Sequence, residues 1–181
     1  FGWSTSATNF GVSTSDSNRS YSGSFVDWGI NKIGNDAPNT WRTLTKDEWD
    51  YLLTYRNNAN ILKGIARVNG VNGLIFLPDN WVCPAGVTFK HGFHSSYGKE
   101  YYATYQTYTA DQWVLLENAG AVFLPAAGYR DGSNARIMQL RGEYWSATEG
   151  EKNSSGFFIF SSEEASVEYD DRYYGLSVRL V

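Results

Sequence analysis

The segment TKDEWDYLL, residues 45–53, carries the strongest local structural signal in the chain. Thr45 and Glu48 have the spacing of a capping box, in which the threonine hydroxyl and the glutamate carboxylate satisfy two otherwise unpaired amides at a helix start. Trp49 and the two leucines that follow it at i+3 and i+4 form one apolar face. We therefore predict a helix that begins after Thr45, ends near Arg56 and buries this face.

A second segment of the same kind, TADQ, occupies residues 109–112. Gln112 replaces the glutamate as the reciprocal partner of the threonine. Trp113 and Leu116 supply an apolar face, and Gly120 is suited to end the helix because glycine adopts the left-handed backbone conformation without strain. The sequence thus predicts two helices of about three turns each.

Most of the remaining sequence is typical of strands and turns. Residues 65–77 combine short apolar runs with Asn-Gly pairs at 69–70 and 72–73, which predict tight hairpin turns because both residue types tolerate positive φ. Residues 83–108 have little periodicity and are expected to form a long loop. We predict an α+β fold with two α-helices packed on twisted antiparallel β-sheets, and further strands at residues 121–124, 144–147, 156–160, 165–169 and 176–181.

Composition and charge limit the class of protein. Of the 181 residues 42% are hydrophobic and 19% are charged, which is typical of a globular protein, and we assign residues 1–181 to a single domain. The net charge of −4 argues against a nucleic-acid partner, since nucleic acids select basic surfaces. No apolar run approaches the roughly 20 residues that cross a bilayer, so no membrane span is expected. Cys83 is the only cysteine, which excludes an intrachain disulfide.

Longer motifs follow one another over most of the chain. In their length and order they resemble those of the Fibrobacter succinogenes major paralogous domain family. The resemblance implies a C-type-lectin-like fold, an extracellular or cell-surface location associated with the outer membrane of Bacteroidetes, and a native chain with an additional N-terminal portion before Phe1. The motifs are DWG at 27–29, WRTLT at 41–45 leading to EW at 48–49, GLIFLP at 73–78, GAVFLPAAGYR at 120–130, YWSAT at 144–148 and GLSVRLV at 175–181.

The sequence lacks the known motifs for metal binding and catalysis that we tested. The sequence lacks the Glu-Pro-Asn, Gln-Pro-Asp and Trp-Asn-Asp triplets with which sugar-binding C-type lectins hold calcium. One cysteine cannot provide the two-cysteine copper site of the formylglycine-generating enzymes, which share the fold that the resemblance implies. No Gly-x-Ser-x-Gly nucleophile motif occurs either. We therefore expect neither enzyme activity nor a cofactor.

Two groups of residues leave other chemistry open. Cys83, His91 and His94 could form a zinc site with Glu100 or a water as the fourth ligand, although strong zinc signatures have more closely spaced ligand pairs. Five carboxylates lie between residues 163 and 171 and could supply a hydrolytic pair. Their density is more typical of a solvated strand and loop, which is the interpretation we adopt.

Three segments are candidates for recognition: residues 131–141, 149–155 and 162–174. They are rich in residues that combine rigid aromatic area with adaptable hydrogen bonding, although ordinary polar loops without a dedicated ligand have the same composition. We predict an extracellular binding or display module for an unidentified glycan or protein. The alternative is a structural component of a pilus or adhesin without a small-molecule ligand, which would present a self-complementary interface or an unpaired edge strand. The candidate ligand contacts are Tyr129, Asp131, Asn134, Arg136, Glu149, Asn153, Tyr169, Asp171 and Tyr173.

Overall fold

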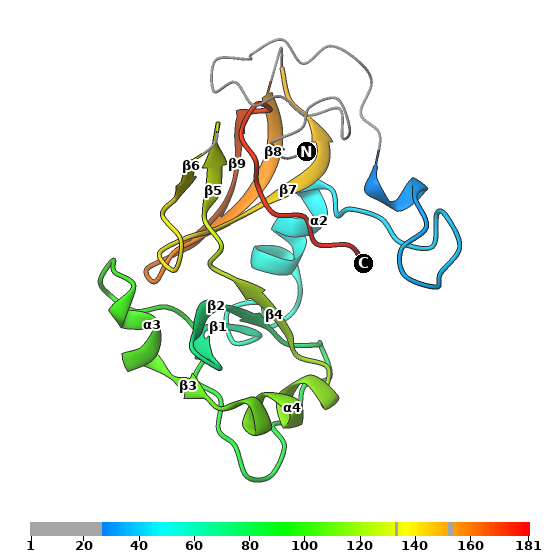
Figure 1. The fold of residues 1–181 in the computed structure, drawn as a ribbon. Helices are drawn as coiled ribbons and strands as arrows, with labels where there is room; N and C mark the ends of the chain where they lie inside the picture. Colours follow the sequence, from blue (N-terminus) through cyan, green and yellow to red (C-terminus); the bar gives the residue numbers. More distant parts are fainter. Residues whose placement is uncertain (1–26, 133, 152–153) are drawn as a thin grey trace.

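The computed structural model describes residues 27–132, 134–151 and 154–181 (Figure 1). Within these ranges the strands form a four-stranded sheet of order β3-β1-β2-β4, a three-stranded sheet of order β7-β8-β9 and the hairpin β5-β6. The helical elements are η1 (Trp28–Ile30), α2 (Lys46–Asp50), η2 (Tyr51–Tyr55), α3 (Glu100–Tyr105) and α4 (Ala110–Asn118). The strands are β1 (Lys63–Val68), β2 (Val71–Phe76), β3 (Thr107–Tyr108), β4 (Val122–Pro125), β5 (Tyr129–Asp131), β6 (Asn134–Arg136), β7 (Gly142–Glu149), β8 (Ser154–Phe160) and β9 (Ala165–Asp171).

The first predicted helix is confirmed, with a change of helix type along its length. Thr45 Oγ1 accepts a hydrogen bond from the Glu48 amide at 3.2 Å, and Glu48 Oε2 accepts one from the Thr45 amide at 2.8 Å. α2 continues into the π-helical turn η2, which ends at Arg56. Arg42 adds two hydrogen bonds to the same carboxylate, at 2.6 and 2.5 Å, and these are the main reason why the pKa of Glu48 falls to about 2.

We expect Thr45→Ala to lower the free energy of unfolding by about 1 kcal/mol, because the Glu48 amide loses its side-chain acceptor. Urea unfolding at pH 7 measures this change. Thr54→Ala is the matched control, since Thr54 is exposed on η2 and its truncation should change stability by less than about 0.5 kcal/mol. Equal losses in the two variants would show that the capping hydroxyl contributes no stability.

The second predicted helix is also confirmed. Thr109 Oγ1 accepts a hydrogen bond from the Gln112 amide at 3.3 Å, and Gln112 Oε1 accepts one from the Thr109 amide at 3.0 Å. Leu116 of α4 is fully buried in the core. Gly120 has a φ of 93° just after the last helical turn, so it adopts the left-handed conformation expected of a helix terminator.

The β1–β2 hairpin confirms one predicted Asn-Gly turn and corrects the other. Asn69 and Gly70 connect the strands with φ values of 45° and 84°, as a tight hairpin turn requires. Asn72 and Gly73 instead lie within β2, so the second predicted turn is wrong. The buried Asn72 amide donates hydrogen bonds to two backbone carbonyls from distant loops, and a Cβ on Gly73 would lie 2.4 Å from a carbonyl of β4. This second pair is therefore explained by packing.

A third helix lies in the segment that was predicted to be a long loop, residues 83–108. α3 has six residues, which is too short to show a recognisable apolar period. It also begins without a side-chain cap, so the sequence carries no start signal for it. The fully buried Tyr102 fixes it to the main core. β3 follows directly and pairs parallel to β1, so the predicted antiparallel arrangement holds for the other strand pairs but not for this one.

Most of the further predicted strands are present as β4, β7, β8 and β9. The exception is the C-terminal segment 176–181, where a strand was predicted. This region makes only isolated pairings, and these join Gly175 to Arg130, Ser177 to Tyr144 and Leu180 to Thr43. Because each pairing has a different partner segment, no continuous ladder forms.

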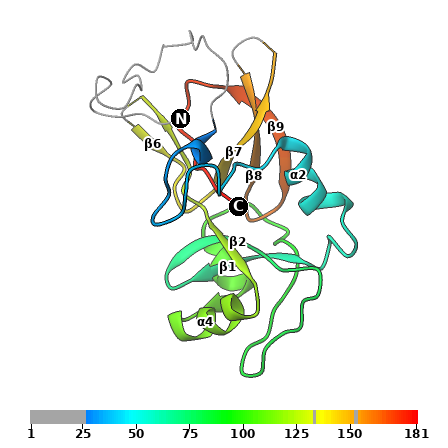
Figure 2. The same ribbon diagram turned by 90° about the vertical axis from the view of Figure 1, so that its right-hand side faces the viewer.

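α2 joins the two larger sheets through one core (Figure 2). The Trp49 ring stacks on Phe158 of β8 with centroids 4.8 Å apart, and it lies 6.5 Å from the Phe76 ring of β2. α4 covers the opposite face of the four-stranded sheet, where Leu116 packs with Ile75. This arrangement confirms the α+β class. None of the helices that the structure describes is long and apolar enough to cross a membrane.

Candidate functional site

The three-stranded sheet has two different faces because side chains alternate along each strand. One set, which includes Phe158, faces α2 and belongs to the main core. The other set points away from α2, on what we call the outer face. Trp145, Phe157 and Leu176 form an apolar cluster there, the outer-face cluster, against which Ile159 also packs.

Charged side chains flank the apolar residues of the outer face. The register places Glu143 of β7 opposite Ile159, and Ile159 in turn opposite Ser166 of β9. It also places Phe157 opposite Glu168. Directly opposed residues share a face of a sheet, so these two carboxylates lie on the same side as the apolar residues.

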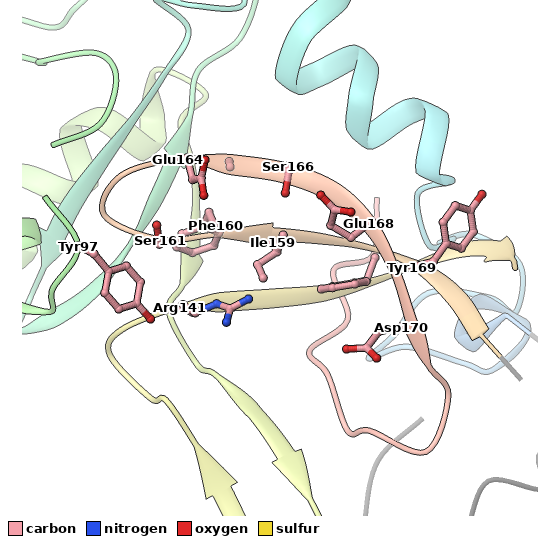
Figure 3. Close-up of a pocket in the computed structure, with 12 residues that line it drawn as sticks. Tyr97, Arg141, Ile159, Phe160, Ser161, Glu164, Ser166, Glu168, Tyr169 and Asp170 are labelled. Atoms are coloured by element: carbon pink, nitrogen blue, oxygen red, sulfur yellow. The ribbon is translucent and has the colours of Figure 1, made fainter. Parts of the chain in front are cut away.

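A pocket of about 660 Å³ opens on this face (Figure 3). The Arg141 side chain lies between Tyr97 at one end of the pocket and Asp170 at the other. Ile159 supplies an apolar surface beside the guanidinium. The remaining wall comes from the β8–β9 turn and from β9, through Glu164, Ser166 and Glu168.

Two carboxylates near Arg141 have perturbed acidities. The Glu143 side chain is 5% exposed, and its Oε1 lies 3.5 Å from Arg141 Nη2. Burial raises the pKa of Glu143 to about 7, and the charge of Asp170 adds to the effect while Arg141 opposes it. Burial also raises the pKa of Asp170, again against the influence of Arg141. The guanidinium therefore pairs with Glu143 and acts electrostatically on Asp170, two carboxylates that the fold has partly removed from water.

The β5–β6 hairpin brings four of the predicted ligand contacts to one side. Tyr129 pairs directly with Arg136, and Asp131 with Asn134, so their side chains share a face. Arg136 Nη2 lies 3.9 Å from Asp131 Oδ2. The Tyr129 ring meets the Tyr174 ring edge-on at a centroid distance of 5.2 Å and packs against the outer-face cluster.

A fifth predicted contact belongs to the same region. The Tyr173 ring lies 4.2 Å from that of Tyr174. The pKa of Tyr129 is raised, first by burial and then by the charges of Glu143 and Asp131. The hairpin and the buried Glu143 therefore share one electrostatic environment beside the outer-face pocket.

The other predicted contacts lie elsewhere or are not described. Tyr169 borders the pocket but directs its ring toward α2, where Lys46 Nζ lies 5.3 Å from the ring centroid. Glu149 forms a 3.5 Å ion pair with Arg172 and lines a separate depression of about 640 Å³ at the β7–β8 turn. Asp171 ends β9 on the same face as Tyr169, and Asn153 lies outside the described residues. The described members of the predicted set thus do not gather at one site. Five lie at the β5–β6 hairpin and the loop after β9, and three lie elsewhere on the three-stranded sheet.

Sequence reasoning did not select Tyr97 or Glu143, and it placed Arg141 and Asp170 within the recognition segments 131–141 and 162–174 without naming them as ligand contacts. Glu143 had a usable signal, because it stands two residues before Trp145 in a run of buried strand residues, and a carboxylate in such a position marks an electrostatically unusual site. Asp170 was interpreted as part of a solvated strand, but it is partly buried and its pKa is raised. Tyr97 has no local signal, since only the tertiary fold brings it to β8 and β9.

The candidate zinc ligands do not form a metal-binding group in the part of the chain that the structure describes. His94 Nδ1 accepts a hydrogen bond from the Ser96 amide at 3.0 Å, and its ring stacks on Tyr101 at 4.2 Å. Cys83 is exposed and its thiol donates to a backbone carbonyl four residues on. Within residues 27–132, 134–151 and 154–181, neither Cys83, His91, His94 and Glu100 nor any other histidine, cysteine and carboxylate side chains form a group of three that could hold a metal ion.

Comparison with known proteins gives one partial match. Residues 98–181 match a family described as a domain of unknown function, DUF8237. The matched part contains α3, the β5–β6 hairpin and the whole three-stranded sheet, and so all of the pocket wall except Tyr97. No curated protein and no solved structure gives a significant match.

Proposed function

We propose that this protein is a non-enzymatic ligand-binding module of a bacterial cell-surface protein, and that it binds a glycan in the outer-face pocket. We also propose that the chain has a C-type-lectin-like fold and that it is related to the Fibrobacter succinogenes major paralogous domain family. The observation that carries it is the lining of one open pocket by the Arg141 guanidinium, the Glu168 and Asp170 carboxylates and the exposed Tyr97 ring. Sugar hydroxyls both donate and accept hydrogen bonds, and the apolar face of a sugar packs on an aromatic ring.

The same geometry favours binding over catalysis. Glu143 has the pKa of about 7 that suits a general acid or base. Its side chain is 5% exposed, however, and it is not among the residues that line the pocket. A catalytic carboxylate has to reach the bond that it breaks. We therefore assign Glu143 to the support of Arg141 and not to contact with the ligand.

One feature favours the structural alternative. β9 pairs with β8 on one side, and among the described residues no backbone ladder occupies its other edge. An open edge can accept a strand from another chain. β9 carries Glu168, Asp170 and Asp171 among its seven residues, and charges on an edge strand discourage such pairing. Strand addition is therefore the second candidate.

We expect Tyr97→Ala to weaken glycan binding about tenfold, because the sugar loses its aromatic contact, which is worth about 1 kcal/mol or more. A glycan array with the soluble protein identifies the probe, and titration calorimetry with the strongest array ligand then measures the dissociation constant. Tyr55→Ala is the matched control, since Tyr55 is 72% exposed on η2 and does not line the pocket.

The array is repeated with a chelator, and binding is expected to be unchanged because no calcium-binding triplet is present. Equal glycan affinities of the Tyr97→Ala and Tyr55→Ala variants would show that the glycan does not bind in the outer-face pocket. An empty array together with self-association that grows with protein concentration would favour strand addition through β9 instead.

A further inference from the structure

A smaller pocket, of about 300 Å³, lies where α2 meets β2, β4 and the C-terminal segment. Of the twelve described residues that line it, nine carry apolar side chains, one is a glycine and two are arginines. Trp49 and Leu52 contribute from α2, Phe76 from β2, and Val122 and Leu124 from β4. The lining is thus apolar except for two positive charges.

The C-terminal segment supplies one wall of this pocket and is held firmly in place. Arg42 and Val181 exchange backbone N–H···O hydrogen bonds of 3.1 and 2.9 Å. Side chains alternate along an extended segment, so Val178 packs on the outer-face cluster while Arg179 and Val181 line the pocket. The backbone pairing therefore holds the segment that carries Arg179 at this wall.

The two arginines differ in what they bind. Arg56 is 4% exposed, and its guanidinium donates to the carbonyls of Leu52, Leu77 and Leu62 at 3.0, 2.8 and 2.9 Å. Its donors are therefore committed to the protein. The Arg179 side chain is exposed, and its guanidinium makes no hydrogen bond or ion pair with any residue that the structure describes. Arg179 is the cation that is available to a ligand.

We propose that this pocket binds an unbranched aliphatic monocarboxylate of about the size of octanoate, with the chain against Trp49 and Leu124 and the carboxylate paired with Arg179. A guanidinium pairs with a carboxylate through two parallel hydrogen bonds. Burial of each methylene group away from water adds further to the affinity. The pocket lies at the lower end of the usual range for ligand sites, which suits a short chain.

The lining also excludes the obvious competitors. A peptide would bring an amide group with every residue, and apart from the two arginines no lining side chain except the Trp49 indole carries a hydrogen-bonding group. A cationic amphiphile would meet the Arg179 guanidinium and no carboxylate within the described lining, since the only other charged lining residue, Arg56, is also positive and pairs with Asp79 outside the lining. A molecule with its polar atoms at one end, and those negative, fits both conditions. This inference concerns a pocket separate from the outer-face pocket and does not depend on the proposed glycan binding.

The test is titration calorimetry of the whole chain with sodium octanoate, with 1-octanol and octylammonium as matched probes at the same pH and ionic strength. We expect octanoate to bind and both other probes to bind at least about tenfold more weakly, since a hydrogen bond to a charged group contributes about 1.5 kcal/mol or more. Arg179→Gln should weaken octanoate binding by a similar factor. Arg67→Gln, at an exposed arginine on β1 outside the pocket, should leave it unchanged.

A second variant tests the apolar part of the pocket. Val122→Phe places a larger side chain in the cavity and should abolish octanoate binding, and circular dichroism checks that the variant is folded. Absence of octanoate binding to the unmodified protein would overturn the proposal. So would equal binding of octanoate and octanol, unchanged binding in Arg179→Gln, or unchanged binding in a folded Val122→Phe variant.

Discussion

We expect Arg56→Met to lower the free energy of unfolding by about 4 kcal/mol. The guanidinium of Arg56 connects three parts of the chain, since its hydrogen bonds reach the helical carbonyl of Leu52 and the backbone carbonyls of Leu62 and Leu77 on either side of the β1–β2 hairpin. Methionine fills much of the same volume but donates no hydrogen bond, so these acceptors lose their partner. Each buried acceptor that is left without a partner costs about 1–3 kcal/mol, and relief from burying the guanidinium offsets part of the sum.

Urea unfolding at pH 7 measures this loss, and Arg67→Met is the control. Arg67 is exposed and its guanidinium donates to the Gly70 carbonyl at 3.2 Å, so its replacement should change stability by less than about 1 kcal/mol. A loss below about 1 kcal/mol for Arg56→Met would mean that the carbonyls find other partners. Burial, and after it the charge of Arg56, lowers the pKa of Lys63, whose Nζ donates to the Leu53 and Ala59 carbonyls. Arg56→Met should therefore raise that pKa.

The sequence predicts those parts of the fold whose signals are local. Both capping boxes involve residues three positions apart, so Thr45 with Glu48 and Thr109 with Gln112 report a helix start whatever surrounds them. The turn at Asn69 and Gly70 is equally local. The pair at Asn72 has the same dipeptide but serves packing against distant loops, and no sequence pattern distinguishes the two cases.

The outer-face pocket was less accessible to sequence reasoning because its walls come from four separate segments. Five of the predicted contacts do gather near it on the β5–β6 hairpin and the loop after β9. The more informative residue is Glu143, because strand alternation places this carboxylate on a buried face beside Trp145. A choice of candidate contacts by polar residue type selects residues expected to be exposed, and so it omits the buried Glu143.

We expect Glu143→Gln to make the protein more stable than the wild type at pH 8, by about 3 kcal/mol, and to leave a much smaller difference at pH 5. The folded pKa of Glu143 is about 7 against an ordinary value of 4.5, because burial favours the protonated form. Between these values the native state holds a proton that the unfolded state has released. The stabilising contribution is therefore complete below about pH 4.5 and is lost as the pH rises through 7, at about 1.4 kcal/mol for each unit of difference.

The amide of glutamine copies the protonated carboxyl in shape and does not titrate, so the variant lacks this loss. Urea unfolding at pH 5, 6, 7 and 8 follows it, with Glu117→Gln on the exposed face of α4 as a control for removal of one negative charge. The range stops at pH 5 because Glu48, whose pKa is lowered to about 2, contributes the opposite dependence in more acidic solution. Asp170 contributes a slope of the same sign that remains in the variant, since burial also raises its pKa. Parallel stability curves for wild type and Glu143→Gln would show that Glu143 is already ionised in the folded protein, with Arg141 outweighing burial.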